Sequence, residues 1–149
     1  MRTRGLHALA LICSSLAACG ARDAPEITIR ESCRAEDLEV QVEGGHPLSC
    51  AELLRVTQAY RAEYEARFGR RGLGGRPVRY RDADFLDGDG HTGRTYPDAI
   101  DLARFDWAEL PHELNHVRTG PGHDRWCLDF EPWSEAVLGV DERAYLGCP

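Results

Sequence analysis

The feature that most constrains this chain is the stretch 112–116, which reads His-Glu-x-x-His. On a helix, positions four apart lie one turn apart on the same face. A helix here would direct the imidazoles of His112 and His116 at one ion, and zinc accepts imidazole nitrogens at about 2.0–2.1 Å. Glu113 would lie about 100° further around the helix. Its carboxylate would then stand beside the ion, where it can take a proton from a metal-bound water.

The residues around the motif predict the helix that this geometry needs. Apolar residues recur at helical spacing, and Gly120-Pro121 is a stop signal. Residues 106–109 have the pattern of a capping box, which predicts a start at Asp106. Pro111 is awkward five residues past that point, so the alternative is a start near Leu110 with Pro111 in the first turn. The apolar positions are Leu110, Leu114 and Val117.

The motif resembles that of the zincin superfamily of zinc metallopeptidases. The resemblance implies that His112 and His116 are ligands of a Zn²⁺ cofactor, that Glu113 is the general base, and that the substrate is a peptide or protein. It also implies a small α+β domain with a long helix behind a twisted sheet and a short C-terminal helical segment. An edge strand before the active-site helix would pair with extended substrate, and residues 97–102 are its expected position.

A catalytic zinc site usually has three protein ligands, and two candidates for the third follow the motif. The metzincins continue the motif with a glycine and a histidine, and here Gly120 and His123 each stand one residue later than in that pattern. The gluzincins use a glutamate about twenty residues on, a position that Glu135 loosely matches. We favour His123, because the turn at residues 120–122 can return it to the ion. Further candidates are Asp124, Asp129 and Glu131.

The rest of the chain predicts one α+β domain over residues 27–149. Ser49 and Glu52 form a capping box that predicts a helix to about Phe68. Alternating or β-rich patterns predict strands at residues 27–30, 38–42, 78–81 and 96–102. Residues 82–91 are rich in acids and glycine, and we interpret them as a hairpin turn, with a calcium loop as the alternative.

The N-terminus predicts export and a lipid anchor. Arg2 and Arg4 precede an apolar run that is too short to span a membrane. Residues 16–20 resemble a bacterial lipobox, which implies a signal peptide over residues 1–18, lipid on Cys19 and a tether over residues 19–26. Because Gly20 follows the cysteine, we expect the outer membrane of the cell envelope. The alternative is an ordinary secretory signal cleaved nearby.

Four cysteines remain after Cys19, and an even number in an exported chain predicts disulfides with three possible connectivities. By loop length we favour Cys33–Cys50 and Cys127–Cys148. A zinc–cysteine cluster is the rival interpretation, but the sequence has no Cys-x-x-Cys pair.

Charge narrows the class of partner. The formal net charge of −7 would become −9 once Arg2 and Arg4 leave with the signal peptide, and no basic patch is present. This argues against nucleic acid as a partner. The sequence therefore predicts a membrane-tethered, zinc-dependent endopeptidase that uses Glu113 as general base. Alternatives are a non-catalytic, zinc-stabilised binding or adhesion lipoprotein, and a metal-free surface protein held by disulfides.

Overall fold

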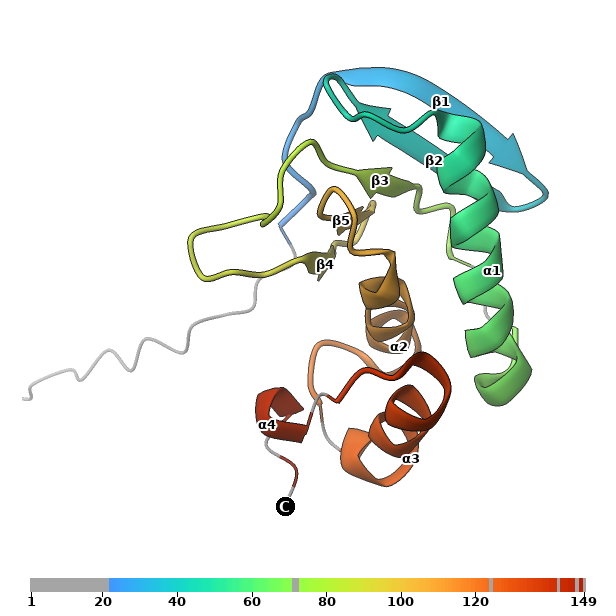
Figure 1. Ribbon diagram of the computed structural model, residues 1–149, viewed down its shortest axis with the longest axis vertical. Helices are drawn as coiled ribbons and strands as arrows, with labels where there is room; N and C mark the ends of the chain where they lie inside the picture. Colours follow the sequence, from blue (N-terminus) through green and yellow to red (C-terminus); the bar gives the residue numbers. More distant parts are fainter. Residues whose placement is uncertain (1–21, 71–72, 124, 142, 147, 149) are drawn as a thin grey trace, which may run out of the picture.

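The computed structural model describes residues 22–70, 73–123, 125–141, 143–146 and 148, and it has the expected α+β architecture (Figure 1). The signal peptide and Cys19 lie outside these residues. Within the described part, no helix is both long enough and apolar enough to cross a membrane. The strands are β1 (Ile29–Ala35), β2 (Leu38–Glu43), β3 (Val78–Tyr80), β4 (Gly93–Thr95) and β5 (Ile100–Leu102). The helices are α1 (Cys50–Phe68), the 3₁₀ turn η1 (Trp107–Glu109), α2 (Leu110–Thr119), α3 (Trp126–Trp133), the π-helical turn η2 (Ser134–Leu138) and α4 (Arg143–Leu146).

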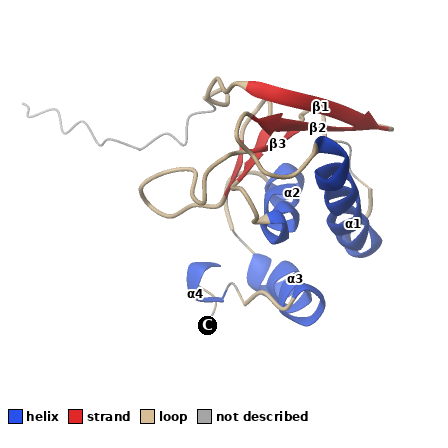
Figure 2. Ribbon diagram, turned by 45° about the horizontal axis from the view of Figure 1, so that its top comes forward, coloured by secondary structure: helices blue, strands red, loops and turns tan. Residues whose placement is uncertain are grey.

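The five strands form one sheet in the order β1-β2-β3-β5-β4. β1 and β2 are an antiparallel hairpin, β2, β3 and β5 run parallel, and β4 closes the sheet antiparallel to β5. The parallel pair β2–β3 needs a crossover connection, and α1 supplies it. Both views show α1 and α2 on the same side of the sheet, with α3 and α4 beyond α2 (Figures 1 and 2).

The edge strand before the motif helix is not where the sequence predicted it. Residues 97–102 were expected at the edge, but β5 lies inside the sheet between β3 and β4, and all three of its residues are buried. The charged Asp101 can lie in this buried strand because the Arg79 guanidinium donates two hydrogen bonds to its carboxylate, at 2.5 and 2.8 Å. The edge strand is instead β4, which also precedes α2 in the sequence. Residues 82–91 do not join a hairpin of β3 and β4, because β5 lies between these strands, although the Leu86 amide donates to the His91 carbonyl at 2.7 Å and closes a turn.

α1 begins and ends as the sequence predicts. Ser49 accepts a hydrogen bond from the Glu52 amide, and the Glu52 carboxylate accepts one from the Ser49 amide, so the capping box is confirmed. Leu53 and Tyr64 lie in the core. The buried face also carries Arg61, whose guanidinium donates to both carboxylate oxygens of Asp37 at 3.0 and 2.9 Å. This pair fastens the helix to the turn between β1 and β2.

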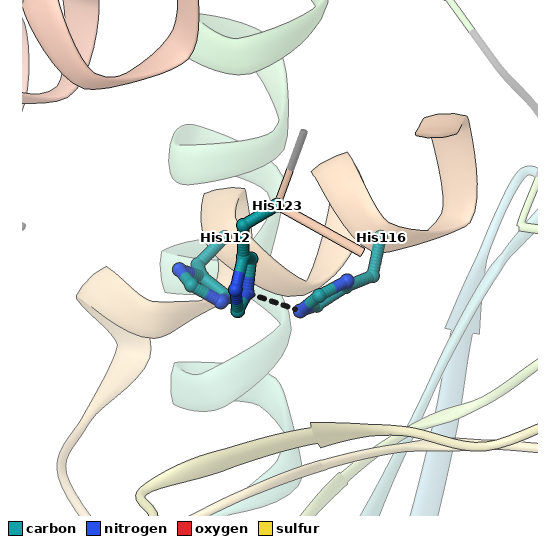
Figure 3. A group of neighbouring side chains, drawn as sticks. All are labelled: His112, His116 and His123. Carbon is teal, nitrogen blue, oxygen red and sulfur yellow. Dashed lines mark hydrogen bonds between the residues drawn. The ribbon is translucent and has the colours of Figure 1, made fainter. Parts of the chain in front are cut away.

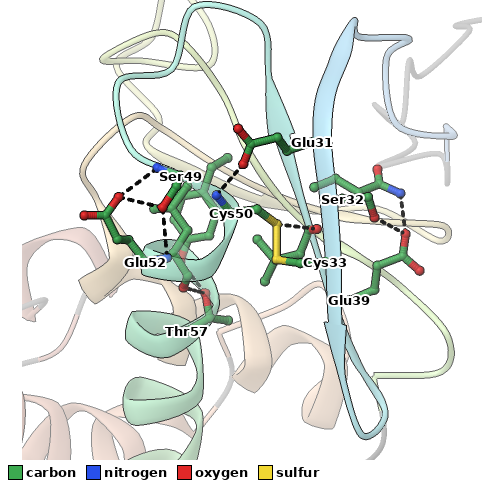
Figure 4. Close-up of a disulfide and its surroundings, with 12 residues drawn as sticks. Glu31, Ser32, Cys33, Glu39, Ser49, Cys50, Glu52 and Thr57 are labelled. Atoms are coloured by element: carbon green, nitrogen blue, oxygen red, sulfur yellow. Dashed lines mark hydrogen bonds between the residues drawn. A yellow bond between two sulfur atoms is a disulfide. The ribbon is translucent and has the colours of Figure 1, made fainter.

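Both favoured disulfide pairings are confirmed. Cys33–Cys50 joins β1 to the first residue of α1 (Figure 4). Cys127–Cys148 joins α3 to the C-terminal end of the chain and closes a loop with a sequence separation of 21. The second bridge holds the segment after α3 against the helix that borders the histidines of the motif.

Candidate metal centre

The motif lies on α2, which starts at the later of the two predicted positions. η1 comes first, α2 begins at Leu110, and Pro111 occupies its first turn. Asp106 makes no side-chain capping bond, so the capping box expected at residues 106–109 is wrong. A proline in the first turn lacks only an amide that would have no helical partner, and its fixed φ suits the helix. Gly120 ends α2 with φ of 92°, a conformation that favours glycine.

α1 fixes the orientation of α2 through a buried polar contact. Asn115, inside the motif, is fully buried, and its Oδ1 accepts hydrogen bonds from Tyr64 Oη at 2.9 Å and Arg118 Nε at 2.8 Å. Because Tyr64 lies on α1, this contact sets the rotation of α2 about its own axis. The rotation in turn decides where the motif histidines point.

The structure brings three histidines together (Figure 3). His112 and His116 project from successive turns of α2, and His123 returns to them after the turn at Gly120. One potential ligand atom from each lies within 4.8 Å of the other two. The Nε2 atoms of His116 and His123 are 3.2 Å apart. Two imidazoles bound to one tetrahedral zinc would place these atoms roughly 3.3 Å apart, so the pair fits such an ion.

The surroundings of the three rings orient them. Nδ1 of His116 lies 3.0 Å from the carbonyl oxygen of Gly120. A carbonyl only accepts, so in the neutral ring Nδ1 carries the hydrogen and Nε2 keeps its lone pair for a metal. The buried indole of Trp126 packs against all three rings, with centroid distances of 4.8 Å to His112, 4.7 Å to His116 and 4.7 Å to His123.

Glu113 is buried on the side of α2 that faces the edge strand. Its side chain is 3% exposed, and Thr95 Oγ1 lies 2.7 Å from Oε2 and 3.0 Å from the Glu113 carbonyl oxygen. Burial raises the pKa of the Glu113 carboxyl, and the hydrogen bond from Thr95 acts in the opposite direction. Gly93 completes the enclosure, because a Cβ atom there would stand 2.7 Å from Glu113 Oε1.

Glu109 brings another carboxylate to the site. It precedes α2 by one residue, and its Oε1 lies 4.0 Å from His112 Nδ1. Oxygen and nitrogen atoms of Glu109, His112 and Glu113 also lie within 4.8 Å of one another. The sequence suggested only a capping role for Glu109, and no sequence signal linked Thr95 or Gly93 to Glu113.

The rival third ligands lie elsewhere or have other partners. Glu135 forms an ion pair with Arg143, which also binds Glu131 at 3.0 Å. Asp129 pairs with Arg118 at 3.1 Å, and Asp124 lies outside the described residues. The geometry therefore brings His123 to the motif histidines and does not bring Glu135 there.

A second group of potential metal ligands lies in the loop between β3 and β4, where a calcium loop was the alternative interpretation. Asp87, Asp89 and His91 are close enough to share an ion. Asp87, however, forms an ion pair with Arg94 at 2.5 Å and accepts a hydrogen bond from the Asp89 amide at 2.9 Å, so it already has a role in building the loop.

Comparison of the chain with models of known protein families, with curated proteins and with solved structures gave no match.

Proposed function

We propose that this protein is a zinc-dependent peptidase of the zincin type. The observation that carries the proposal is the meeting of His112, His116 and His123, with the buried carboxylate of Glu113 close to His112 on α2. Three imidazoles plus an open position form a donor set that catalytic zinc sites use. The separation of the His116 and His123 Nε2 atoms fits such an ion, and the Gly120 carbonyl oxygen, by accepting from Nδ1 of His116, keeps Nε2 of that ring deprotonated for the metal.

Each side chain of the site would have its own role in hydrolysis. Zinc bound there would act as a Lewis acid and promote ionisation of water. The three histidines would hold the ion, and Trp126 would exclude solvent from their rings. Glu113 would accept a proton from the attacking water at one carboxylate oxygen and deliver it to the leaving amine. Thr95 would keep the Glu113 carboxylate in one orientation through its 2.7 Å contact with Oε2.

The proposal is tested by zinc content and peptide cleavage on the same preparations. We expect one zinc per chain, and cleavage of a mixed peptide library that stops with chelator and returns with zinc. Glu113→Gln should keep the zinc and lose at least a hundredfold in turnover. Full turnover by zinc-loaded Glu113→Gln would refute the mechanism.

The third ligand has its own test. His123→Ala should weaken zinc binding far more than the roughly 10–100-fold loss that follows removal of a supporting group. Glu135→Ala is the matched control, since this carboxylate pairs with Arg143. Near-native zinc affinity in His123→Ala would contradict the assignment of His123.

One observation favours a second candidate function, a zinc-stabilised binding lipoprotein without turnover. Glu113 is 3% exposed and engaged with Thr95, as a purely structural carboxylate would be. Glu109, 4.0 Å from His112, offers a possible fourth protein ligand, and a closed set of four is typical of structural zinc. X-ray absorption of the zinc protein separates the two, because a catalytic site keeps a water ligand and a structural site has none.

We also propose that the protein is exported and tethered to the bacterial envelope, at the outer membrane, by lipid on Cys19. The two disulfides support an oxidising compartment. Mass spectrometry of the protein purified from membranes should find a diacylglycerol-modified Cys19 at the new N-terminus. A chain that still begins at Met1, or one cleaved without lipid, would contradict the tether.

A further inference from the structure

A cavity of about 310 Å³ opens beside His112, at one end of the histidine cluster. Three segments that are distant in the sequence meet around it: the β3–β4 loop, η1 and the residues before α4. Each contributes one carboxylate, and among the described residues no arginine lines the cavity. The polar and charged lining residues are Asp89, His91, Thr92, Glu109, His112 and Asp141.

Two of the carboxylates that line the cavity, Asp89 and Asp141, differ from nearby carboxylates that pair with arginine. In the same loop, Asp87 pairs with Arg94 at 2.5 Å, whereas the Asp89 side chain is exposed on the cavity wall. Near the C-terminus, Arg143 directs its guanidinium to Glu131 and Glu135. The carboxylate of Asp141, also exposed, accepts the backbone amide of Arg143 at 3.0 Å.

We propose that this cavity, whose acidic rim is formed by Asp89, Glu109 and Asp141, binds a positively charged substrate side chain, with arginine as the preferred residue. The inference rests on the proposed peptidase function, and it assigns the class of peptide that this site selects. Because the cavity borders His112, the bound side chain would belong to a residue close to the cleaved bond.

Size and hydrogen-bonding geometry both favour arginine. Ligand cavities commonly measure about 300–1,000 Å³, so this one lies at the lower end and suits one side chain with its backbone. The carboxylates come from three separate segments of the chain. A guanidinium has five N–H donors in a planar fork and can reach several carboxylates, while an ammonium is a compact point charge.

Two peptides that differ only in charge provide the test. The probes are fluorescein-labelled alanine octapeptides with a central arginine or a central citrulline, which has nearly the same shape and no charge. Affinity is measured by fluorescence anisotropy on zinc-loaded Glu113→Gln protein, and turnover on the wild type. We expect the arginine peptide to bind about five to ten times more tightly at low salt, and the ratio to shrink at high salt.

Substitutions of the rim carboxylates test whether they cause the preference for the arginine peptide. Asp89→Asn and Asp141→Asn should each reduce the arginine-to-citrulline ratio, and the double variant should bring it close to one. Glu63→Gln removes a carboxylate from the exposed face of α1 and should leave the ratio unchanged. Equal affinities for the two peptides, or an unchanged ratio in the double variant, would overturn the inference. The peptidase proposal fails if the wild type cleaves nothing in the mixed peptide library, while the ratio of affinities still decides whether the cavity selects positive charge.

Discussion

Substitution of Gly93 by alanine tests how β4 positions the proposed base. Gly93 is buried on the edge strand, opposite Leu102 of β5, and its φ is not in the left-handed region. Alanine therefore suits the backbone, and the cost is steric. The new Cβ would stand 2.3 Å from Glu109 Cγ, 2.7 Å from Glu113 Oε1 and 3.0 Å from Glu113 Cγ.

The size of the effect follows from these distances. Ordinary contacts of a Cβ begin at 3.4 Å, so Oε1 must retreat by at least 0.7 Å from its 2.7 Å position. Glu109 is half-buried, whereas Glu113 is 3% exposed and engaged with Thr95. Such overpacking typically costs about 1–3 kcal/mol. A misplacement of about 1 Å at a reacting group can cost a hundredfold in rate, so we expect kcat to fall about 10–100-fold.

The assay compares urea unfolding, zinc content and kcat of Gly93→Ala with those of Gly44→Ala. Gly44 is a matched control, because its Cβ would meet only Thr28 O, at an ordinary 3.8 Å, and its φ is also outside the left-handed region. We expect Gly93→Ala to keep its zinc and lose turnover, while Gly44→Ala behaves like the wild type. Wild-type kcat in Gly93→Ala, with stability within about 0.5 kcal/mol, would show that β4 does not hold the base.

Three further predictions concern stability. The hydrogen bond from Arg61 holds the pKa of Asp37 well below its usual range, so this pair stabilises the folded state fully above about pH 4 and less as pH falls further. Asp37→Asn should therefore flatten the decline of the urea unfolding midpoint between about pH 5 and pH 2.5. Parallel curves for the variant and the wild type would contradict this. Removal of zinc by a chelator should change Trp126 fluorescence, because this indole packs against His116. It should also lower the melting temperature, because a ligand at a thousand times its Kd stabilises the fold by about 4 kcal/mol. An unchanged melting temperature would refute the coupling of zinc binding to folding. Replacing both Cys127 and Cys148 by alanine should cost about 2–5 kcal/mol in calorimetry, and no loss would mean that the bridge constrains little.

The parts of the fold that the sequence predicted correctly depend on local patterns. The capping box at Ser49 and Glu52 specified the start of α1, because both hydrogen bonds join residues three apart. The pairing Cys33–Cys50 was favoured by its short loop. His112 and His116 needed only a helix between them to lie on one face. In each case the interacting groups are close in the chain, so few alternative arrangements compete.

The errors arise where a partner comes from far away in the sequence. The strand at residues 100–102 has the pattern of a short strand, but its place inside the sheet depends on pairing with both β3 and β4. Its charged residue, Asp101, is fully buried because Arg79, 22 residues earlier, neutralises it. Sheet order is a property of these distant pairings, and alternating polarity alone does not determine it.

In the proposed enzyme, the groups that would bind the metal are close together in the sequence, whereas the groups that would support catalysis come from distant segments. The three histidines all come from residues 112–123, so a local stretch forms the proposed metal site. The environment of Glu113 depends instead on Thr95, 18 positions earlier, and the acidic rim joins the β3–β4 loop to the segment that Cys127–Cys148 holds in place. Zinc content should therefore respond to changes within α2 and the turn after it. Turnover and charge preference should respond to changes in β4 and the rim that leave the zinc bound.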